Sequence, residues 1–482
     1  MMGTHDPQKE LFSYQVDLER RVRADHPLRA VRRAVDFSFV RAEVAQFYGG
    51  NGNVSVDPEV ILKLMFLLFF DGVRSERELL RMLPERLDYL WFLGFGLDAE
   101  IPDHSVLSKA RARWGKEVFE ALFVRTVGQC VAAGLVDGRK LHLDGSLVTA
   151  HASRESVVKS TPELITALKA AYAQQAAKLT EPGPAPDERL VNATLVSTTD
   201  PDAAGVRSRT DSSRPRYKHH RAVDDRCGVI TAVETTPGDV MENHRATGLV
   251  EQHERTTGHA AQTVVADRQY GTADNYRTFQ QRGLITHLAP LQQGPSYAEQ
   301  GLFRHAQFRY DPAADVYTCP AGQTLPAVSR DATVRTTRYQ TAAGVCPACP
   351  LRAQCTRAKH GRTLRRHDDY EWIERGWTQA RSAAGRRDLR RRRHLMEGSF
   401  AQAANLHHFK RARWRRLWRQ QIQDWLIAAV QNIKLWLRHA QPKPAVAHAP
   451  TRSTNRNSIA PLALRAPSCR RLMFAAQVLA FY

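Results

Sequence analysis

The stretch KLHLDGSLVTAHAS, at residues 140–153, decides the fold. Its first half alternates apolar leucines with His142 and Asp144, a pattern typical of a strand with one buried face. A carboxylate in the middle of a strand is costly to bury alone, so Asp144 should be paired, solvated in a cleft or bound to a cation. The plainer interpretation is an edge-strand aspartate that faces water.

A second aspartate, Asp267, follows a short apolar run at residues 263–266 that contains two adjacent valines. This run predicts a central strand, and Asp267 stands at its carboxyl end, where open sheets place their chemistry. Two aspartates on neighbouring strands would converge on one point. Their hard oxygen ligands suit Mg²⁺ or Mn²⁺ better than zinc, and a third carboxylate is expected to complete the site.

Composition sets the class of partner. The chain has 482 residues, 43% of them hydrophobic, which is enough for two or three domains with their own cores. Lysine and arginine total 70 against 49 aspartate and glutamate residues, for a formal net charge of +21. This excess predicts a nucleic-acid partner, because neutralised phosphates release counterions. With neither a membrane-length apolar run nor a signal-peptide pattern, we expect a cytoplasmic protein that does not enter membranes.

Residues up to about 135 are predicted to be helical. Asp57 and Pro58 form an N-cap and first-turn pair, and apolar residues then recur at helical spacing as far as Asp71. A second short helix begins near Ser75. Two helices joined by a glycine-containing turn are compatible with a DNA-reading helix-turn-helix or with a plain packing unit.

The middle of the chain predicts an α/β sheet with an antiparallel side. Residues 218–223 and 229–235 flank the turn residues 224–228, which is a hairpin pattern. A helix from about Asn243, the strand before Asp267, a further helix and a last strand follow. This order places the two aspartates on different strands of one sheet.

Four of the seven cysteines cluster in one region, which favours metal binding over a disulfide scaffold. They are Cys319, Cys346, Cys349 and Cys355. One C-x2-C pair with two more distant cysteines fits a structural Zn²⁺ held by four thiolates, with His360 as an alternative ligand. Unmetallated thiols are the competing interpretation.

The most basic segment follows residue 397. Its cations are Lys410, Arg411, Arg413, Arg415, Arg416 and Arg419, and they interleave with Trp414 and Trp418. The mixture fits phosphate binding with bases stacked on the tryptophans, or a solvated charged face with the tryptophans in the core. The apolar stripe at residues 422–437 predicts a core helix, and the composition of residues 441–482 predicts a disordered tail.

Several separate segments carry a family resemblance. HLDGSLVTAHAS (142–153) and VVADRQYGT (264–272) each surround one of the aspartates, and STTDPDA (197–203) precedes the hairpin. PDHSVLSKAR (102–111) closes the helical part. Together and in this order they resemble the DDE transposases of bacterial insertion sequences. The resemblance implies a ribonuclease H-like catalytic core.

The resemblance also implies a glutamate on a late helix, with an arginine four residues earlier and a lysine seven residues later. Arg393 and Glu397 supply the first two, whereas Ala404 occupies the lysine position. Either a neighbour such as Lys410 substitutes for that lysine, or this copy is impaired. An i, i+4 salt bridge is the plainer interpretation of the Arg393 and Glu397 pair, and Asp388 is the reserve candidate for the acid.

The resemblance implies that Asp144, Asp267 and Glu397 hold Mg²⁺ or Mn²⁺ and catalyse cleavage at the ends of the element and strand transfer into target DNA. The partner is then double-stranded DNA, both terminal inverted repeats and target, bound by a homo-oligomer at the nucleoid. Arg393 and the segment from Lys410 to Arg416 are expected to bind this DNA. An inactive DNA-binding relic and a nuclease with the same fold are the alternatives.

The expected organisation has five parts. They are a helical DNA-binding domain (1–135), the first part of the catalytic domain (136–300), a cysteine-rich insertion (301–365), the helices that carry Glu397 (366–440) and the tail (441–482).

Overall fold

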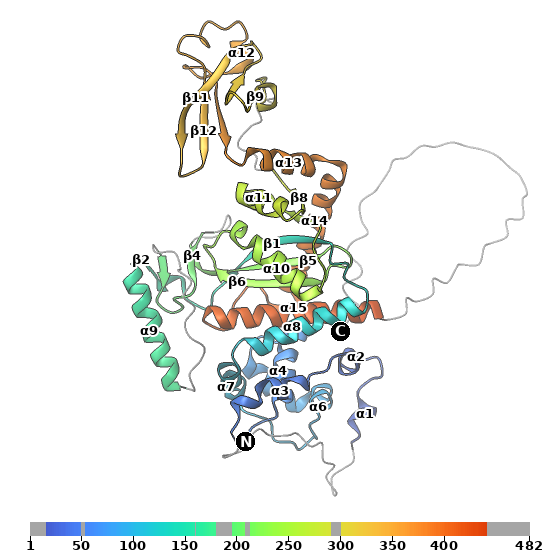
Figure 1. The fold of residues 1–482 in the computed structure, drawn as a ribbon. Helices are drawn as coiled ribbons and strands as arrows, with labels where there is room; N and C mark the ends of the chain where they lie inside the picture. Colours follow the sequence, from blue (N-terminus) through green and yellow to red (C-terminus); the bar gives the residue numbers. More distant parts are fainter. Residues whose placement is uncertain are drawn as a thin grey trace, which may run out of the picture. The chain divides into compact units, whose positions relative to one another are not determined.

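The computed structural model describes residues 16–49, 54–159, 161–179, 195–207, 213–290 and 300–440 (Figure 1). The tail at residues 441–482, for which disorder is expected, lies outside the described residues.

The helical N-terminal region that the sequence predicts is confirmed. Its helices are α1 (Leu18–Arg21), α2 (Pro27–Ala34), α3 (Phe39–Val44), α4 (Pro58–Phe70), α5 (Glu76–Met82), α6 (Leu87–Leu93), α7 (Ser105–Trp114) and α8 (Glu117–Ala132). The Asp57 side chain caps α4 by accepting a hydrogen bond from the Glu59 N–H, as the sequence predicts. Every α4 residue except Glu59 and Lys63 is buried, so α4 is the central packing helix of this region.

A mixed sheet carries the two aspartates. Its strands are β1 (Lys140–Thr149), β2 (Val157–Lys159), β3 (Leu195–Ser197), β4 (Ala204–Val206), β5 (Arg214–Asp224), β6 (Ile230–Pro237), β7 (Thr263–Ala266) and β8 (Ile285–Leu288). The predicted hairpin is β5 and β6, which pair antiparallel. β1 lies between β5 and β7, and it pairs antiparallel with β5 and parallel with β7. β7 in turn pairs parallel with β8. The predicted mixed α/β architecture is therefore confirmed.

Helices pack on this sheet, and α15 joins it to the N-terminal helices. The helices on the sheet are α10 (Ala246–Thr257), α11 (Ala273–Gln281), α13 (Tyr370–Arg381), α14 (Ala383–His407) and α15 (Leu417–Ala440), and a further helix, α9 (Pro162–Leu179), follows β2. α14 contacts β1, β7 and β8, whereas α15 contacts β6 on one side and α4 and α8 on the other (Figure 1). The apolar residues Ile422, Trp425, Leu426, Ala429 and Ile433 of α15 are buried, which confirms the core role predicted for this stripe.

The STTDPDA segment has a structural role at the start of α15. Asp202 accepts hydrogen bonds from the Leu417 N–H at 3.0 Å and from Arg416 Nε at 2.9 Å. Asp200 accepts hydrogen bonds from the Tyr217 hydroxyl at 2.7 Å and from the Arg416 N–H at 3.2 Å. A carboxylate at a helix N-terminus satisfies free N–H groups and interacts favourably with the helix dipole, so this segment fixes where α15 begins.

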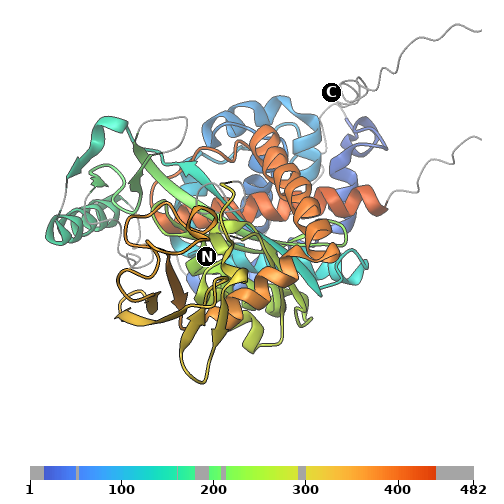
Figure 2. The ribbon, with the colours of Figure 1, turned by 90° about the horizontal axis from the view of Figure 1, so that it is seen from above.

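Residues 309–367 form a second sheet. Its strands are β9 (Arg309–Asp311), β10 (Val316–Thr318), β11 (Thr324–Asp331), β12 (Thr336–Gln340) and β13 (Thr363–His367), and the short helix α12 (Arg352–Cys355) precedes β13. The strands pair in the antiparallel order β13-β12-β11-β10-β9. Phe308, Tyr317, Leu325, Tyr339 and Leu364 give this segment a small core of its own. In Figures 1 and 2, α13 leads from this sheet to α14.

Asp200 gives a prediction about stability and pH. Burial raises its pKa to about 7, so between pH 4 and 7 the folded chain keeps a proton that the unfolded chain releases. The stability from this proton is complete below about pH 4 and is lost as the pH rises through 7. We expect the wild type to lose roughly 2 kcal/mol more stability between pH 5 and pH 8 than Asp200→Asn does. Thermal unfolding at the two pH values measures this, and equal losses would contradict it.

Candidate active site

The structure brings Asp144 and Asp267 together, as the sequence predicts. β1 pairs with β7 only at residues 140–142, so β1 continues beyond the end of that pairing and Asp144 stands just past it. Asp267 directly follows β7, and its side chain accepts a hydrogen bond from the Gln269 N–H at 2.9 Å. Parallel pairing of β1 and β7 therefore places both carboxylates at the same end of the sheet.

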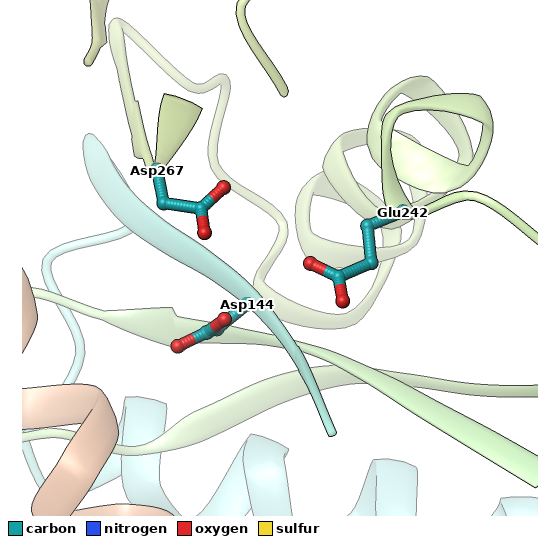
Figure 3. A group of neighbouring side chains, drawn as sticks. All are labelled: Asp144, Glu242 and Asp267. Atoms are coloured by element: carbon teal, nitrogen blue, oxygen red, sulfur yellow. The ribbon is translucent and has the colours of Figure 1, made fainter. Parts of the chain in front are cut away.

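Glu242 is the third member of this group. The ligand oxygens of Asp144, Glu242 and Asp267 all lie within 4.8 Å of one another. Figure 3 shows the carboxyl groups of Asp267 and Glu242 turned toward each other, next to the strand that carries Asp144. Among the described residues, these are the only three metal-binding side chains that lie this close together. We call them the carboxylate group.

Sequence reasoning missed Glu242, although a weak signal was present. Glu242 begins the single-turn helix Glu242–Arg245, which leads from the hairpin into α10. The sequence predicts a helix from about Asn243, one residue later. A glutamate in the turn between a strand and a helix is common, so only its spatial neighbours show its significance.

Gly145 makes room for Glu242. A Cβ atom added at Gly145 would lie 2.7 Å from Glu242 Cδ and 2.8 Å from Glu242 Oε1. Such a contact is too short, so any larger residue at position 145 would displace the Glu242 carboxyl. The Asp-Gly pair in the first motif thus supplies one ligand and the space for another.

The electrostatics of the carboxylate group favour a bound cation. Burial raises the pKa of Asp144, and the neighbouring Asp267 adds to this effect. Burial also raises the pKa of Glu242 to about 7. The nearby Tyr270 hydroxyl is buried without a hydrogen-bond partner. Buried oxygen ligands with an excess of negative charge fit Mg²⁺ or Mn²⁺.

Arg392 partly compensates this negative charge. Its Nη2 lies 3.0 Å from Asp144 Oδ2, and its Nε donates a hydrogen bond to the Leu143 carbonyl at 3.1 Å. These contacts hold α14 beside β1. Sequence reasoning selected Arg393 rather than Arg392, because the spacing from Glu397 was the only guide.

Glu397 lies outside the carboxylate group. It is exposed on α14, and the next residue toward the N-terminus, Met396, is fully buried. Glu397 stands five positions after Arg392, which places the two side chains on different sides of the helix. Arg393, one turn before Glu397, lines a cavity of about 540 Å³ together with Asp267. The catalytic role of Glu397 stays a prediction.

Asp388, the reserve candidate, is buried in ion pairs. Its carboxylate lies 3.0 Å from Lys140 Nζ and 2.8 Å from His287 Nδ1. These partners come from β1 and β8, so Asp388 anchors α14 across the sheet. A buried carboxylate with two partners of this kind has a structural role.

Further arginines surround Asp267. The cavity beside it is lined by Arg268, Arg381, Arg392 and Arg393. Guanidinium groups bind phosphates through parallel hydrogen bonds, so this cavity has the chemistry to hold a DNA backbone next to the carboxylate group.

Some residues of the basic segment after α14 are bonded to other parts of the protein, and others are exposed. Arg416 is buried and paired with Asp202, which makes it structural. Arg413 donates a hydrogen bond to the Val73 carbonyl, and Arg415 donates one to the His151 carbonyl at 3.1 Å. Lys410 and Arg411 are exposed.

Trp414 packs against protein and also lines a cavity of about 420 Å³. The Arg111 guanidinium lies 3.9 Å from its ring centroid, and Phe69 meets it in an edge-on contact at 6.0 Å. Of the two interpretations for this tryptophan, the structure therefore favours packing over base stacking.

The four clustered cysteines line one small cavity of about 20 Å³, in which Cys319, Cys346, Cys349 and Cys355 all take part. The Gln323 N–H points to Cys319 Sγ at 3.3 Å, and the Thr341 hydroxyl lies 3.0 Å from Cys346 Sγ. Hydrogen bonds to sulfur favour thiolates. The sulfurs are spaced more widely than the atoms of the carboxylate group. His360, the alternative ligand, is exposed.

Comparisons with known protein families indicate which class of protein this chain resembles. Residues 16–113 match a family model described as a transposase domain (DUF772), and residues 318–436 match one described as a transposase DDE domain. These two matches support an insertion-sequence DDE transposase. No curated protein matches this transposase. Within the described part of the transposase, no helix combines the length and apolar character needed to cross a membrane.

Gly145 provides a test of the carboxylate group. We expect Gly145→Ala to fold but to bind Mn²⁺ about 10-fold more weakly, because its methyl group displaces Glu242. Titration of Mn²⁺ into the protein, followed by the electron paramagnetic resonance of the free ion, measures the affinity. Gly128→Ala is the matched control, since an added Cβ there meets nothing within 4 Å. Unchanged Mn²⁺ affinity in Gly145→Ala would contradict this role.

Proposed function

We propose that this transposase cleaves DNA at the ends of its insertion sequence and joins the freed ends to target DNA, using Mg²⁺ or Mn²⁺. The single observation that carries the proposal is the convergence of Asp144, Glu242 and Asp267. The sheet supports a ribonuclease H-like core, because β1 lies between an antiparallel hairpin and two parallel strands.

Each part of the site has a chemical role in this proposal. Asp144, Asp267 and one or both glutamates hold the cation. Bound divalent cations lower the pKa of water and stabilise a leaving oxygen. Arg268, Arg381 and Arg393 orient the phosphate backbone of the strand beside Asp267. A 3′ hydroxyl in the position of the attacking water would turn the same site from hydrolysis to joining.

Two glutamates are candidates for the third ligand. Glu242 already lies in the carboxylate group, whereas Glu397 is exposed on α14. We propose that Glu242 binds the cation in the free protein and that Glu397 joins the site when DNA engages α14. The contact of Arg392 with Asp144 supports this, because it places α14 directly beside the carboxylate group.

The remaining partners follow from charge and family. Double-stranded DNA, both the terminal inverted repeats and the target, matches the net charge of +21. The N-terminal helical domain would recognise the terminal repeats, and a homo-oligomer at the nucleoid would hold two ends together. Arg393, Lys410, Arg411, Arg413 and Arg415 would contact phosphates, with Arg416 holding the segment in place.

Substitution of the aspartates tests the catalytic proposal. We expect Asp144→Asn and Asp267→Asn each to lower Mn²⁺-dependent nicking of supercoiled plasmid by about 100-fold or more, because each removes a negatively charged ligand. Gel separation of nicked and supercoiled DNA measures this. Glu251→Gln, an exposed change on α10, is the matched control and should keep full activity. Nicking at the wild-type rate by both aspartate variants would contradict the proposal.

Metal binding and plasmid nicking distinguish the roles of Glu242 and Glu397. Glu242→Gln should weaken Mn²⁺ binding to the free protein, whereas Glu397→Gln should leave that binding unchanged and lower nicking.

Strand joining is tested by incubating cleaved DNA from the borders of the gene with a supercoiled target. Cleavage without joined product would favour the nuclease. DNA binding without any nicking would favour the inactive relic, which Ala404 supports.

We also propose that the four clustered cysteines bind one structural Zn²⁺. Their shared cavity is large enough for a single ion, and four thiolates would leave no open position for catalysis. The purified protein should contain about one zinc per chain by mass spectrometry, and Cys349→Ser should lose it. Cys227→Ser, outside the cluster, should keep the metal. A zinc-free wild type prepared with zinc in the medium would contradict the proposal.

A further inference from the structure

Arg392 stands at the border between the carboxylate group and the cavity beside Asp267. Its Nη2 lies 3.0 Å from Asp144 Oδ2, and its side chain also lines the cavity of about 540 Å³. The other arginines that line this cavity form no ion pair with any residue that the structure describes. Arg392 is therefore the cavity arginine whose charge is already committed to a metal-binding carboxylate.

Both carboxylate oxygens of Asp144 have a donor. The Gly145 N–H donates to Oδ1 at 2.9 Å, and the Arg392 guanidinium approaches Oδ2. A guanidinium at this oxygen takes up space that a cation bound by Asp144 would need. Its positive charge also repels a cation at the neighbouring ligand oxygens. Arg392 therefore competes with a divalent cation for Asp144.

A second arginine beside Asp144 is fixed in place. Arg221 is the partner of Asp144 in the register between β1 and β5, and it is fully buried. Its Nη1 donates to Ser399 Oγ at 2.7 Å, and its Nε donates to His219 Nε2 at 2.8 Å. The Arg392 side chain keeps 12% of its surface exposed and borders the cavity. Arg392 can therefore leave Asp144 without opening the core, whereas Arg221 cannot.

A DNA phosphate would offer Arg392 an alternative partner of the same kind. A phosphodiester, like a carboxylate, presents two oxygens that accept parallel hydrogen bonds from a guanidinium. The cavity has room for a phosphate group, and the further guanidinium groups in its walls would attract one. The Arg392 Nε donates to the Leu143 carbonyl at 3.1 Å. This bond can hold the side chain beside β1 while the Nη groups change partner.

We propose that Arg392 exchanges partners, from Asp144 before DNA binds to a backbone phosphate when a DNA strand occupies the cavity. The exchange rests on the proposed function, which supplies both the strand and the cation. Arg392 is then a positioning residue that frees Asp144 for the cation only when DNA is in place. DNA and the divalent cation bind cooperatively as a result, and each raises the affinity of the other by the same factor.

Mn²⁺ binding to the protein without DNA gives the first test. We expect Arg392→Gln to bind Mn²⁺ about 10-fold more tightly than the wild type, because a positive charge 3.0 Å from a ligand oxygen is lost. Arg392→Lys keeps the charge and should stay near the wild type. Electron paramagnetic resonance of free Mn²⁺ measures the affinity. Arg391→Gln is the matched control and should not change it, because Arg391 pairs with Asp225 outside the carboxylate group.

The effect of Mn²⁺ on DNA affinity gives the second test. Fluorescence anisotropy of a labelled duplex of arbitrary sequence, with and without Mn²⁺, gives the factor by which the cation strengthens DNA binding. Arg392→Gln should lower this factor about 10-fold, because its Mn²⁺ affinity rises in the free protein and stays unchanged in the DNA complex. Arg391→Gln should keep the wild-type factor, which accounts for general screening of the DNA by Mn²⁺.

Two results would overturn the exchange. Weaker or unchanged Mn²⁺ binding by Arg392→Gln would show that Arg392 only supports the fold of the site. Tighter Mn²⁺ binding by Arg392→Gln with an undiminished factor would show that Arg392 stays at Asp144 when DNA binds.

Plasmid nicking separates the exchange from the proposed function. If both tests give the expected results but the wild type never nicks supercoiled plasmid with Mn²⁺, the catalytic proposal fails and the exchange stands. If the wild type nicks plasmid and Arg392→Gln matches it both in Mn²⁺ affinity and in the factor, the exchange fails and the catalytic proposal stands.

Discussion

Repulsion among three partly buried carboxylates is the constraint around which the sheet region is arranged. Asp144, Glu242 and Asp267 lose solvation and repel one another, so the site requires positive charge. The protein provides part of it through Arg392, which reaches Asp144 from α14. The rest is available to a divalent cation. Holding three carboxylates close together lowers the stability of the fold, and it keeps the metal ligands in a fixed arrangement.

Structural and functional charges lie side by side in this transposase. Asp388 fixes α14 to two strands, and Asp202 fixes the start of α15 through Arg416. Among the described residues, Arg268, Arg381 and Arg393 beside Asp267 form no ion pair, so their charge stays available next to the carboxylate group.

Local patterns predicted several elements around the site, because such patterns depend on neighbouring residues. The N-cap at Asp57, the β5 and β6 hairpin and the short apolar strand before Asp267 are each recognisable from one continuous stretch of the chain. The role of STTDPDA was not recognisable in this way. Its aspartates act on a helix that begins more than 200 residues later in the chain, and no local pattern reports such a contact.

The sequence by itself determined the aspartates of the site, because each is marked by its own strand and by its place in that strand. Only the tertiary structure decided the third carboxylate of the group. Glu242 meets Asp144 because Gly145 leaves space for it and because the hairpin returns the chain to that point. Glu397 shares a helix with Arg392 but leaves it on another side. Which carboxylates meet depends on packing between distant segments, and a linear pattern does not record that packing.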